Sequence, residues 1–206
     1  TGEGRSVNST DKGLAYTGRL EFLPFGAFKS GGDYSEGDLE REPKPKLSFG
    51  GVYSYNASTT NTGGQLGEDL YSPVDMTTFM FDAIFKYRGW AFMVEHLKRN
   101  VDDPLTYNEE GDLSYAYEGS GTNYQGSYIF KNNYETAFRY SNLQPNRALE
   151  LYEKRKEVLE FGLTKYLRNH RVKAQLNINY NISGGRYQFG NVGNKWGTLF
   201  QVELGI

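Results

Sequence analysis

The sequence of 206 residues contains no cysteine, so disulfide frameworks and thiolate metal sites are excluded. It also lacks long hydrophobic runs. The longest, residues 90–94, falls far short of the roughly 18 consecutive apolar residues that a membrane-spanning helix requires. Neither sign of charge is in large excess, because 23 basic residues nearly balance 25 acidic ones and leave a net charge of -2. A dominant basic patch is therefore not expected, which argues against nucleic acid as a partner.

Residues that commonly carry chemistry are few. The two histidines, His96 and His170, have no cysteine or second histidine at metal-ligand spacing, and no glycine-rich phosphate loop or nucleophile elbow is present. We therefore predict a protein that is not an enzyme and that has neither cofactor nor metal. Residues 32–40 are acidic and could supply oxygen ligands to Ca²⁺, but a solvated turn is the simpler interpretation because the EF-hand spacing is absent.

What the sequence does have is strand periodicity, together with 17 tyrosines and 13 phenylalanines. Residues 172–180 read Val-Lys-Ala-Gln-Leu-Asn-Ile-Asn-Tyr, so apolar and polar side chains fall on opposite faces of a strand. The pattern recurs along the chain while the mean hydropathy is -0.68, which leaves little material for an ordinary core. Because a barrel needs apolar residues only at every second position, the pattern is typical of a transmembrane β-barrel.

This alternation predicts nine strands, at residues 14–22, 46–56, 76–87, 90–99, 123–130, 134–142, 158–167, 171–182 and 196–206. Tight turns are expected at 86–89, 131–133 and 168–170, where Gly and Asn supply the positive φ of short hairpins. Long polar loops are expected at 57–75, 100–122, 143–157 and 183–195. Bacterial barrels alternate in the same way, with short periplasmic turns and longer outer loops, so the sequence favours that orientation.

Two features depart from a simple closed barrel. Residues 25–44 fall where a short periplasmic turn belongs, yet they are long and acidic, so we expect an ordered periplasmic excursion within a single β-barrel domain of residues 1–206. Nine is also an odd number, whereas antiparallel closure in single-chain bacterial barrels uses an even one. We therefore expect the C-terminal portion of a larger barrel of about 16 or 18 strands, with upstream strands outside this chain.

Strand parity assigns the side chains to two faces. Charged side chains facing lipid would cost roughly 2 to 4 kcal/mol each near the bilayer midplane, so the apolar set is placed outward. The outward set comprises Leu20, Phe22, Phe49, Tyr53, Tyr55, Phe79, Phe81, Ala83, Phe85, Phe92, Val94, Phe138, Tyr140, Leu159, Phe161, Leu163, Phe200, Val202 and Leu204. The predicted pore lining comprises Arg19, Glu21, Asp82, Glu95, Arg99, Glu135, Arg139, Glu160, Arg171 and Lys173. Polar companions are Thr164, Gln175, Asn177, Asn179, Gln201 and Glu203, and the expected aromatic belts are Tyr87, Trp90, Tyr180 and Trp196.

An ordered series of short motifs resembles the phosphate-selective porin O and P family as it occurs in Bacteroidota. The motifs are GRLEFLPFG at 18–26, GDY at 32–34, EGDL at 36–39, PKL at 45–47, Asp82 with FKYRG at 85–89, YE at 134–135, RY at 139–140 and LFQVEL at 199–204. The similarity lies in the C-terminal half of the family. It implies an outer-membrane porin of about 16 to 18 strands, often trimeric, that passes small anions or other solutes.

Taken together, the sequence predicts a porin of the bacterial outer membrane. Small solutes, anions or phosphate among them, would diffuse passively through a water-filled lumen of mixed charge, with outer-membrane lipid around a homotrimer. A structural or partner-docking barrel in an envelope protein complex is the main alternative. Two others are an outer-membrane lipid-modifying enzyme, which needs a Ser, a His and an acid at one rim, and a soluble β-sandwich, whose strands can show the same alternation.

Overall fold

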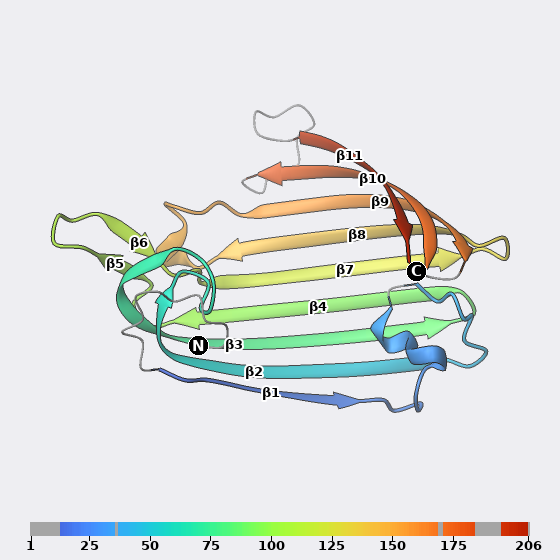
Figure 1. The fold of residues 1–206 in the computed structure, drawn as a ribbon, viewed down its shortest axis with the longest axis horizontal. Coiled ribbons are helices and arrows are strands. Elements are labelled where there is room, and N and C mark those ends of the chain that lie inside the picture. The colour runs from blue at the N-terminus through green and yellow to red at the C-terminus, as the bar shows by residue number, and fades with distance from the viewer. Residues whose placement is uncertain (1–12, 36, 169–170, 184–194, 206) are drawn as a thin grey trace.

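A computed structural model describes residues 13–35, 37–168, 171–183 and 195–205, and these are all-β. Nine strands form one antiparallel sheet (Figure 1), namely β1 (Ala15–Phe22), β2 (Lys46–Asn61), β3 (Asp69–Tyr87), β4 (Trp90–Val101), β7 (Gly119–Ile129), β8 (Tyr134–Pro145), β9 (Lys156–Arg168), β10 (Val172–Ser183) and β11 (Lys195–Leu204). The remaining elements are a small hairpin of β5 (Leu105–Tyr107) and β6 (Leu113–Tyr115) and two 3₁₀ helices, η1 (Lys29–Tyr34) and η2 (Arg147–Leu149). The sequence prediction of an all-β fold with nine strands in one antiparallel sheet is confirmed.

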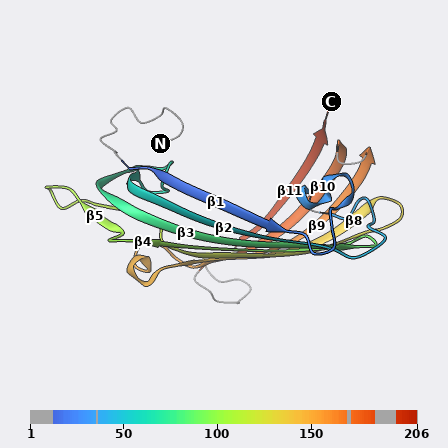
Figure 2. The same cartoon turned by 90° about the horizontal axis from the view of Figure 1, so that it is seen from below.

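The sheet is curved, with one concave and one convex face (Figure 2). Apart from the small hairpin, strand order follows chain order, so each strand pairs with its sequence neighbour through local hairpins. β1 and β11 are the two edges, and in the part of the chain that the structure describes no pairing joins them. The sheet is therefore open, and both edges present unpaired backbone groups.

Two strands run much further than their alternation suggests. The predicted loop at 57–75 is mostly strand, because β2 continues to Asn61 and β3 begins at Asp69. A bulge makes this possible: Ser58 adopts a φ of 48°, and its backbone N–H donates to the Asp75 carboxylate at 2.8 Å. The prediction was wrong here because the extension is polar, and a paired strand that leaves the apolar part of the sheet no longer needs apolar residues at alternate positions.

The other long connections also carry structure. Residues 100–122 hold the β5–β6 hairpin, β7 begins at Gly119, and η2 interrupts the loop predicted at 143–157. The base of the hairpin covers a small buried cluster, composed of Leu70, Val74, Met76, Val101 and Ala116. Other buried apolar side chains include Phe28 in the segment before η1, Ile129 at the end of β7, Leu149 in η2 and Ile182 near the end of β10. None of the described helices is long and apolar enough to span a membrane.

The first tight turn is shorter than expected. Tyr87 pairs with Trp90, so Arg88 and Gly89 alone form the first turn, both with positive φ. Lys86 therefore belongs to strand β3 and not to the turn. The turn at 131–133 is present, with Asn133 at a φ of 62°. The third tight turn and the loop at 183–195 fall largely outside the described residues, as does His170.

Candidate functional site

The charged residues singled out from the sequence gather on the concave face. Cross-strand register places them opposite one another: Asp82 faces Glu95, Arg139 faces Glu160, and Lys173 faces Glu203. Side-chain direction alternates along a strand, so one such pair fixes the face of every residue two positions away. The pore-lining set shares this face except for Arg171, and comprises Arg19, Glu21, Asp82, Glu95, Arg99, Glu135, Arg139, Glu160 and Lys173.

Arg171 is the exception, because it precedes β10 and lies in a turn. Its backbone N–H donates to the Arg168 carbonyl at 3.0 Å, and its own carbonyl accepts from Gly205. The register between β9 and β10 shifts between Val172 and Lys173, so the two-residue alternation does not extend back to Arg171. Its prediction as a strand residue was wrong for that reason.

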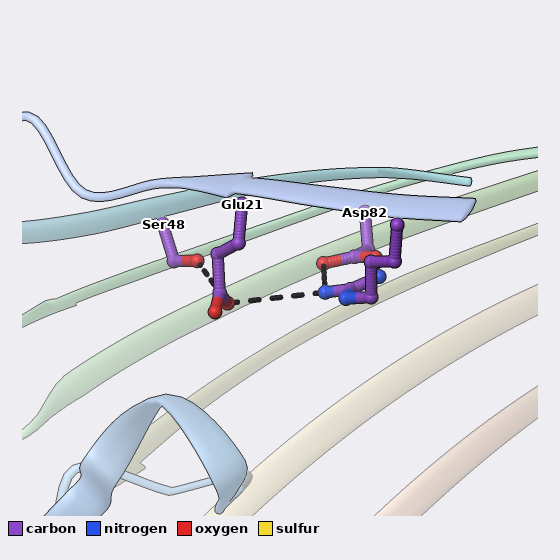
Figure 3. A network of polar contacts seen from close by, with 4 residues as sticks. Glu21, Ser48 and Asp82 are labelled. Atoms are coloured by element: carbon purple, nitrogen blue, oxygen red, sulfur yellow. Dashed lines mark hydrogen bonds and ion pairs between the residues drawn. The ribbon is translucent and has the colours of Figure 1, made fainter.

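At one edge of the sheet, Arg19 on β1 reaches across β2 to Asp82 on β3, and Figure 3 labels Asp82 together with Glu21 and Ser48. The Arg19 guanidinium donates to both carboxylate oxygens of Asp82, at 2.5 and 3.0 Å, and lies 3.8 Å from Glu21, which accepts from Ser48 at 2.9 Å. The intervening residue on β2 is Gly50. A Cβ there would come under 3.0 Å from atoms of both Arg19 and Asp82. Glycine at this position therefore leaves the space in which the bidentate pair forms.

Further ion pairs and hydrogen bonds follow across the concave face. Arg139 binds Glu160 on the next strand, and Lys173 Nζ lies 3.0 Å from Glu203. Glu95 accepts from the Asn123 amide at 3.0 Å. Because most of the cations have a carboxylate neighbour, the face combines dense charge with little net charge.

Arg99 has a different environment, toward the β5–β6 end of the sheet. Its guanidinium donates to Thr78 Oγ1 and to the Gly63 carbonyl, each at 3.2 Å. No carboxylate pairs with it among the described residues. Arg99 thus helps to hold the turn between β2 and β3 against the concave face.

A segment that we call the strap, residues 23–35 and 37–45, covers part of the concave face (Figures 1 and 2). It includes η1 and corresponds to the excursion expected at 25–44. Its main anchor is Lys86, whose side chain is only 1% exposed. The Lys86 ammonium donates to the Ser35 carbonyl at 2.6 Å, to Ser35 Oγ at 3.1 Å and to the Gly37 carbonyl at 2.7 Å. The sequence prediction overlooked this lysine, although two-residue spacing from Asp82 indicates the same face.

A second lysine and two turns fasten the strap further. Lys46 stands directly opposite Lys86, and its ammonium donates to the Phe25 carbonyl at 2.8 Å. Two like charges that face each other across a strand pair are destabilising. The strap carbonyls offset this repulsion because they give each ammonium a hydrogen-bond acceptor. The strap's Asp38 carboxylate accepts from the Gly89 N–H at 2.7 Å, and Arg41 donates to the Phe130 carbonyl at 2.6 Å. The strap is thereby tied to both described tight turns.

A polar cleft of about 360 Å³ opens between the strap and the strands β7 to β10. Gly37 forms one edge, so close to Glu135 and Ile129 that a Cβ would come within 2.5 Å of a Glu135 oxygen. The Glu135 carboxylate accepts from the Tyr166 hydroxyl at 2.6 Å. The lining is polar or charged apart from a few small residues, and comprises Ser35, Gly37, Gln125, Glu135, Ala137, Arg139, Glu160, Gly162, Thr164, Tyr166, Lys173, Gln175 and Asn177.

The convex face has the opposite character. Large apolar side chains point away from the sheet and stay exposed, with Leu20 at 84%, Phe200 at 67% and Phe161 at 50%. Aromatic rings pair across strands, as do Tyr53 with Phe79 at 5.1 Å and Trp90 with Tyr128 at 4.7 Å between centroids. Apart from Trp90 and Tyr128, these side chains belong to the outward set that strand parity assigned.

The other groups of polar side chains are weaker candidates for a functional site. No group of three or more His, Asp or Glu side chains within the described residues is arranged to hold a metal ion, and the strap's Asp38 is committed to backbone N–H groups. His96 shares a 2.9 Å hydrogen bond with Thr122 on the convex face. In the β5–β6 hairpin, partial burial and a hydrogen bond to Glu153 raise the pKa of the Tyr115 hydroxyl above its ordinary value.

Comparison with family models, curated proteins and solved structures finds no match to this chain. The two faces of the sheet, the strap and the cleft are therefore the features that indicate a function. The resemblance to phosphate-selective porins stays a prediction.

Proposed function

We propose that this chain forms part of the wall of a bacterial outer-membrane β-barrel, a porin that lets small solutes diffuse through a water-filled lumen. One observation carries the proposal: a single curved sheet has an exposed apolar convex face and a polar, charged concave face. The concave curvature puts the polar side inward. No enzymatic step is part of this function.

The convex face supports a lipid-facing role. Soluble proteins rarely expose contiguous apolar patches beyond a few hundred Å², and here exposed Phe, Leu and Trp side chains occur on β1, β3, β4, β8, β9, β10 and β11. Surrounding lipid removes these side chains from water. Trp90 and Trp196, near the ends of their strands, suit the aromatic belts at the two membrane interfaces.

The concave face supports a wet lumen. Ionised groups such as Arg139 and Glu160 would be costly in a dry interior, whereas water and their mutual pairing make them stable in a pore. Because the cations alternate with carboxylates, we propose a lumen that carries anions such as phosphate, and other small solutes, without strong preference for either sign of charge. A trimer of such barrels is the arrangement that the family resemblance suggests.

The strap acts as a constriction in this proposal. It lies at the end of the sheet where the two described tight turns lie, which is the periplasmic end of a bacterial barrel. By covering part of the concave face there, it narrows the path and sets the size of solute that passes. The hairpin β5–β6 and the other long connections then face outside the cell.

Planar-bilayer conductance of the purified protein tests the proposal. We expect stepwise currents, and we expect Arg139→Ala and Lys173→Ala each to reduce the anion-to-cation permeability ratio, measured from the reversal potential in a salt gradient. Arg88→Ala serves as the matched control, because Arg88 is an exposed cation in the turn between β3 and β4. Absence of stepwise currents from folded, inserted protein would reject the porin function.

A partner-docking barrel is a second candidate, and the strap favours it. Phe25 is 55% exposed on the strap, and Glu40 and Lys44 are also exposed there. An envelope protein could bind this surface from the periplasm. Gentle detergent extraction distinguishes the two: stoichiometric co-purification that Phe25→Ala abolishes would support docking, whereas purification without partners would support the porin.

A further inference from the structure

The cleft under the strap is built for hydrogen bonding more than for charge. The strap forms one wall of the cleft through Ser35 and Gly37, and the other wall comes from strands β7 to β10. Its volume of about 360 Å³ is within the range of small-molecule sites. In the proposed lumen, a passing solute would meet this cleft beside the constriction.

Each cation that lines the cleft has a carboxylate partner. Arg139 is bound to Glu160, and Lys173 lies 3.0 Å from Glu203 on the neighbouring strand. Glu135 adds a further carboxylate to the same lining. A free anion would therefore meet three carboxylates and two cations, and binding it would require breaking an existing ion pair.

The remaining lining groups both donate and accept hydrogen bonds. Gln175 donates one of its two amide N–H groups to Thr164 Oγ1 at 3.2 Å. The side-chain amides of Gln125 and Asn177 form no hydrogen bond with another described residue. Each amide offers two N–H donors and an acceptor oxygen, a set that matches a hydroxyl group, which likewise donates and accepts.

From this combination we infer that the cleft binds a neutral polyhydroxylated solute, of the saccharide class, in preference to phosphate or another free anion. The inference rests on the proposed function for how the solute reaches the cleft, but the binding site itself consists of described residues. Paired charges contribute hydrogen bonds without a net field, and the amides bind the hydroxyl groups. The strap closes one side, so that a bound sugar is held against β9 and β10.

Binding can be measured without conduction, on the protein purified in detergent, by saturation-transfer NMR with sucrose as the probe. We expect a saturable sucrose signal that excess inorganic phosphate does not displace. Removing one amide group in Asn177→Ala or in Gln125→Ala should weaken sucrose binding by about threefold to tenfold. Thr17→Ala is the matched control, since Thr17 is on the same concave face at the far edge and bonds Ser54 instead.

Absence of a saturable sucrose signal, displacement of sucrose by phosphate, or unchanged affinity in both amide variants would overturn the inference. Planar-bilayer currents report on the proposed function separately. Stepwise currents from a protein that does not bind sucrose would reject the saccharide site alone. Saturable sucrose binding by a protein without stepwise currents would reject the porin and support the site.

Discussion

Replacing Lys86 by methionine tests how the strap is held on the concave face. Methionine keeps most of the aliphatic stem of this buried side chain and removes the ammonium. That ammonium donates to two strap carbonyls at 2.6 and 2.7 Å and to a hydroxyl at 3.1 Å. The variant therefore removes the contacts that join the strap to the end of β3 while leaving the sheet's own pairing intact.

The expected cost follows from those contacts. A hydrogen bond to a charged group contributes about 1.5 to 3 kcal/mol, and the carbonyls of Ser35 and Gly37 would also lose their partner. Because the bonds share one donor their contributions do not add fully, so we expect about 3 kcal/mol in total. Since every 1.4 kcal/mol is a factor of ten, the released strap should become about a hundredfold more populated.

Limited trypsin digestion followed by mass spectrometry measures that population. Arg41 reports on it directly, because its guanidinium is held by the Phe130 carbonyl at 2.6 Å and by Asn133 at 3.0 Å while the strap is seated. When opening is fast relative to cleavage, the rate of cleavage after Arg41 follows the equilibrium opening and should rise about a hundredfold in Lys86→Met.

Lys46→Met provides the matched control. Lys46 stands opposite Lys86 but has a single bond to the strap, at 2.8 Å to the Phe25 carbonyl, and is only partly buried. Because this bond is exposed and water can replace the lost donor, we expect the rate of cleavage after Arg41 to rise less than about tenfold in Lys46→Met. Equal cleavage rates in Lys86→Met and the parent protein would refute the assignment of Lys86 as the strap anchor, as would equal effects of the two variants.

Three further predictions address the faces, the strap seat and the sheet edges. Phe161→Arg on the convex face should lower the free energy of unfolding in lipid by roughly 2 to 4 kcal/mol, while Gln201→Arg on the concave face should change it little, as urea titration in vesicles can measure. Gly37→Ala should raise the rate of strap proteolysis, because the new methyl group would collide with Glu135. An unchanged rate would contradict the close contact between Gly37 and Glu135. Oxidation of the double variant Thr17→Cys and Gln201→Cys should give no disulfide within one chain, since these strands are opposite edges; a rapid intramolecular disulfide on gels would reject an open arc.

The two faces were predictable because side-chain direction is a local property of a strand. Once the chain is extended, residues two apart share a face whatever lies on the neighbouring strand. The same two-residue rule that assigned Asp82 and Arg139 correctly to one face failed at Arg171, where a register shift in the β9–β10 pair interrupts it. A bulge in pairing depends on both strands, and one strand's sequence does not specify it.

The strap and the cleft could be predicted only in part. The length and acidity of residues 25–44 indicated an ordered segment, but its position depends on bonds between residues far apart in sequence, such as Lys86 to Gly37 and Arg41 to Phe130. No periodicity encodes such bonds. The need for glycine at Gly37 and Gly50 was equally unpredictable from local sequence. Each glycine makes room for side chains from strands distant in sequence, and neither has a positive φ that local turn chemistry would reveal.

The parity of the sheet constrains how the proposed barrel can close. Neighbouring strands in an order of nine are all antiparallel, so β1 and β11 point in the same direction. Direct pairing of these two edges would be parallel, whereas bacterial barrels close with antiparallel neighbours throughout. Antiparallel closure therefore needs an odd number of further strands between β11 and β1. A second copy in the same orientation cannot supply those strands, because the two-fold axis that pairs β1 with β1 and β11 with β11 turns that copy upside down in the membrane. The ion pairs of the concave face then line only one arc of the lumen, so its ion selectivity depends equally on the strands that complete it.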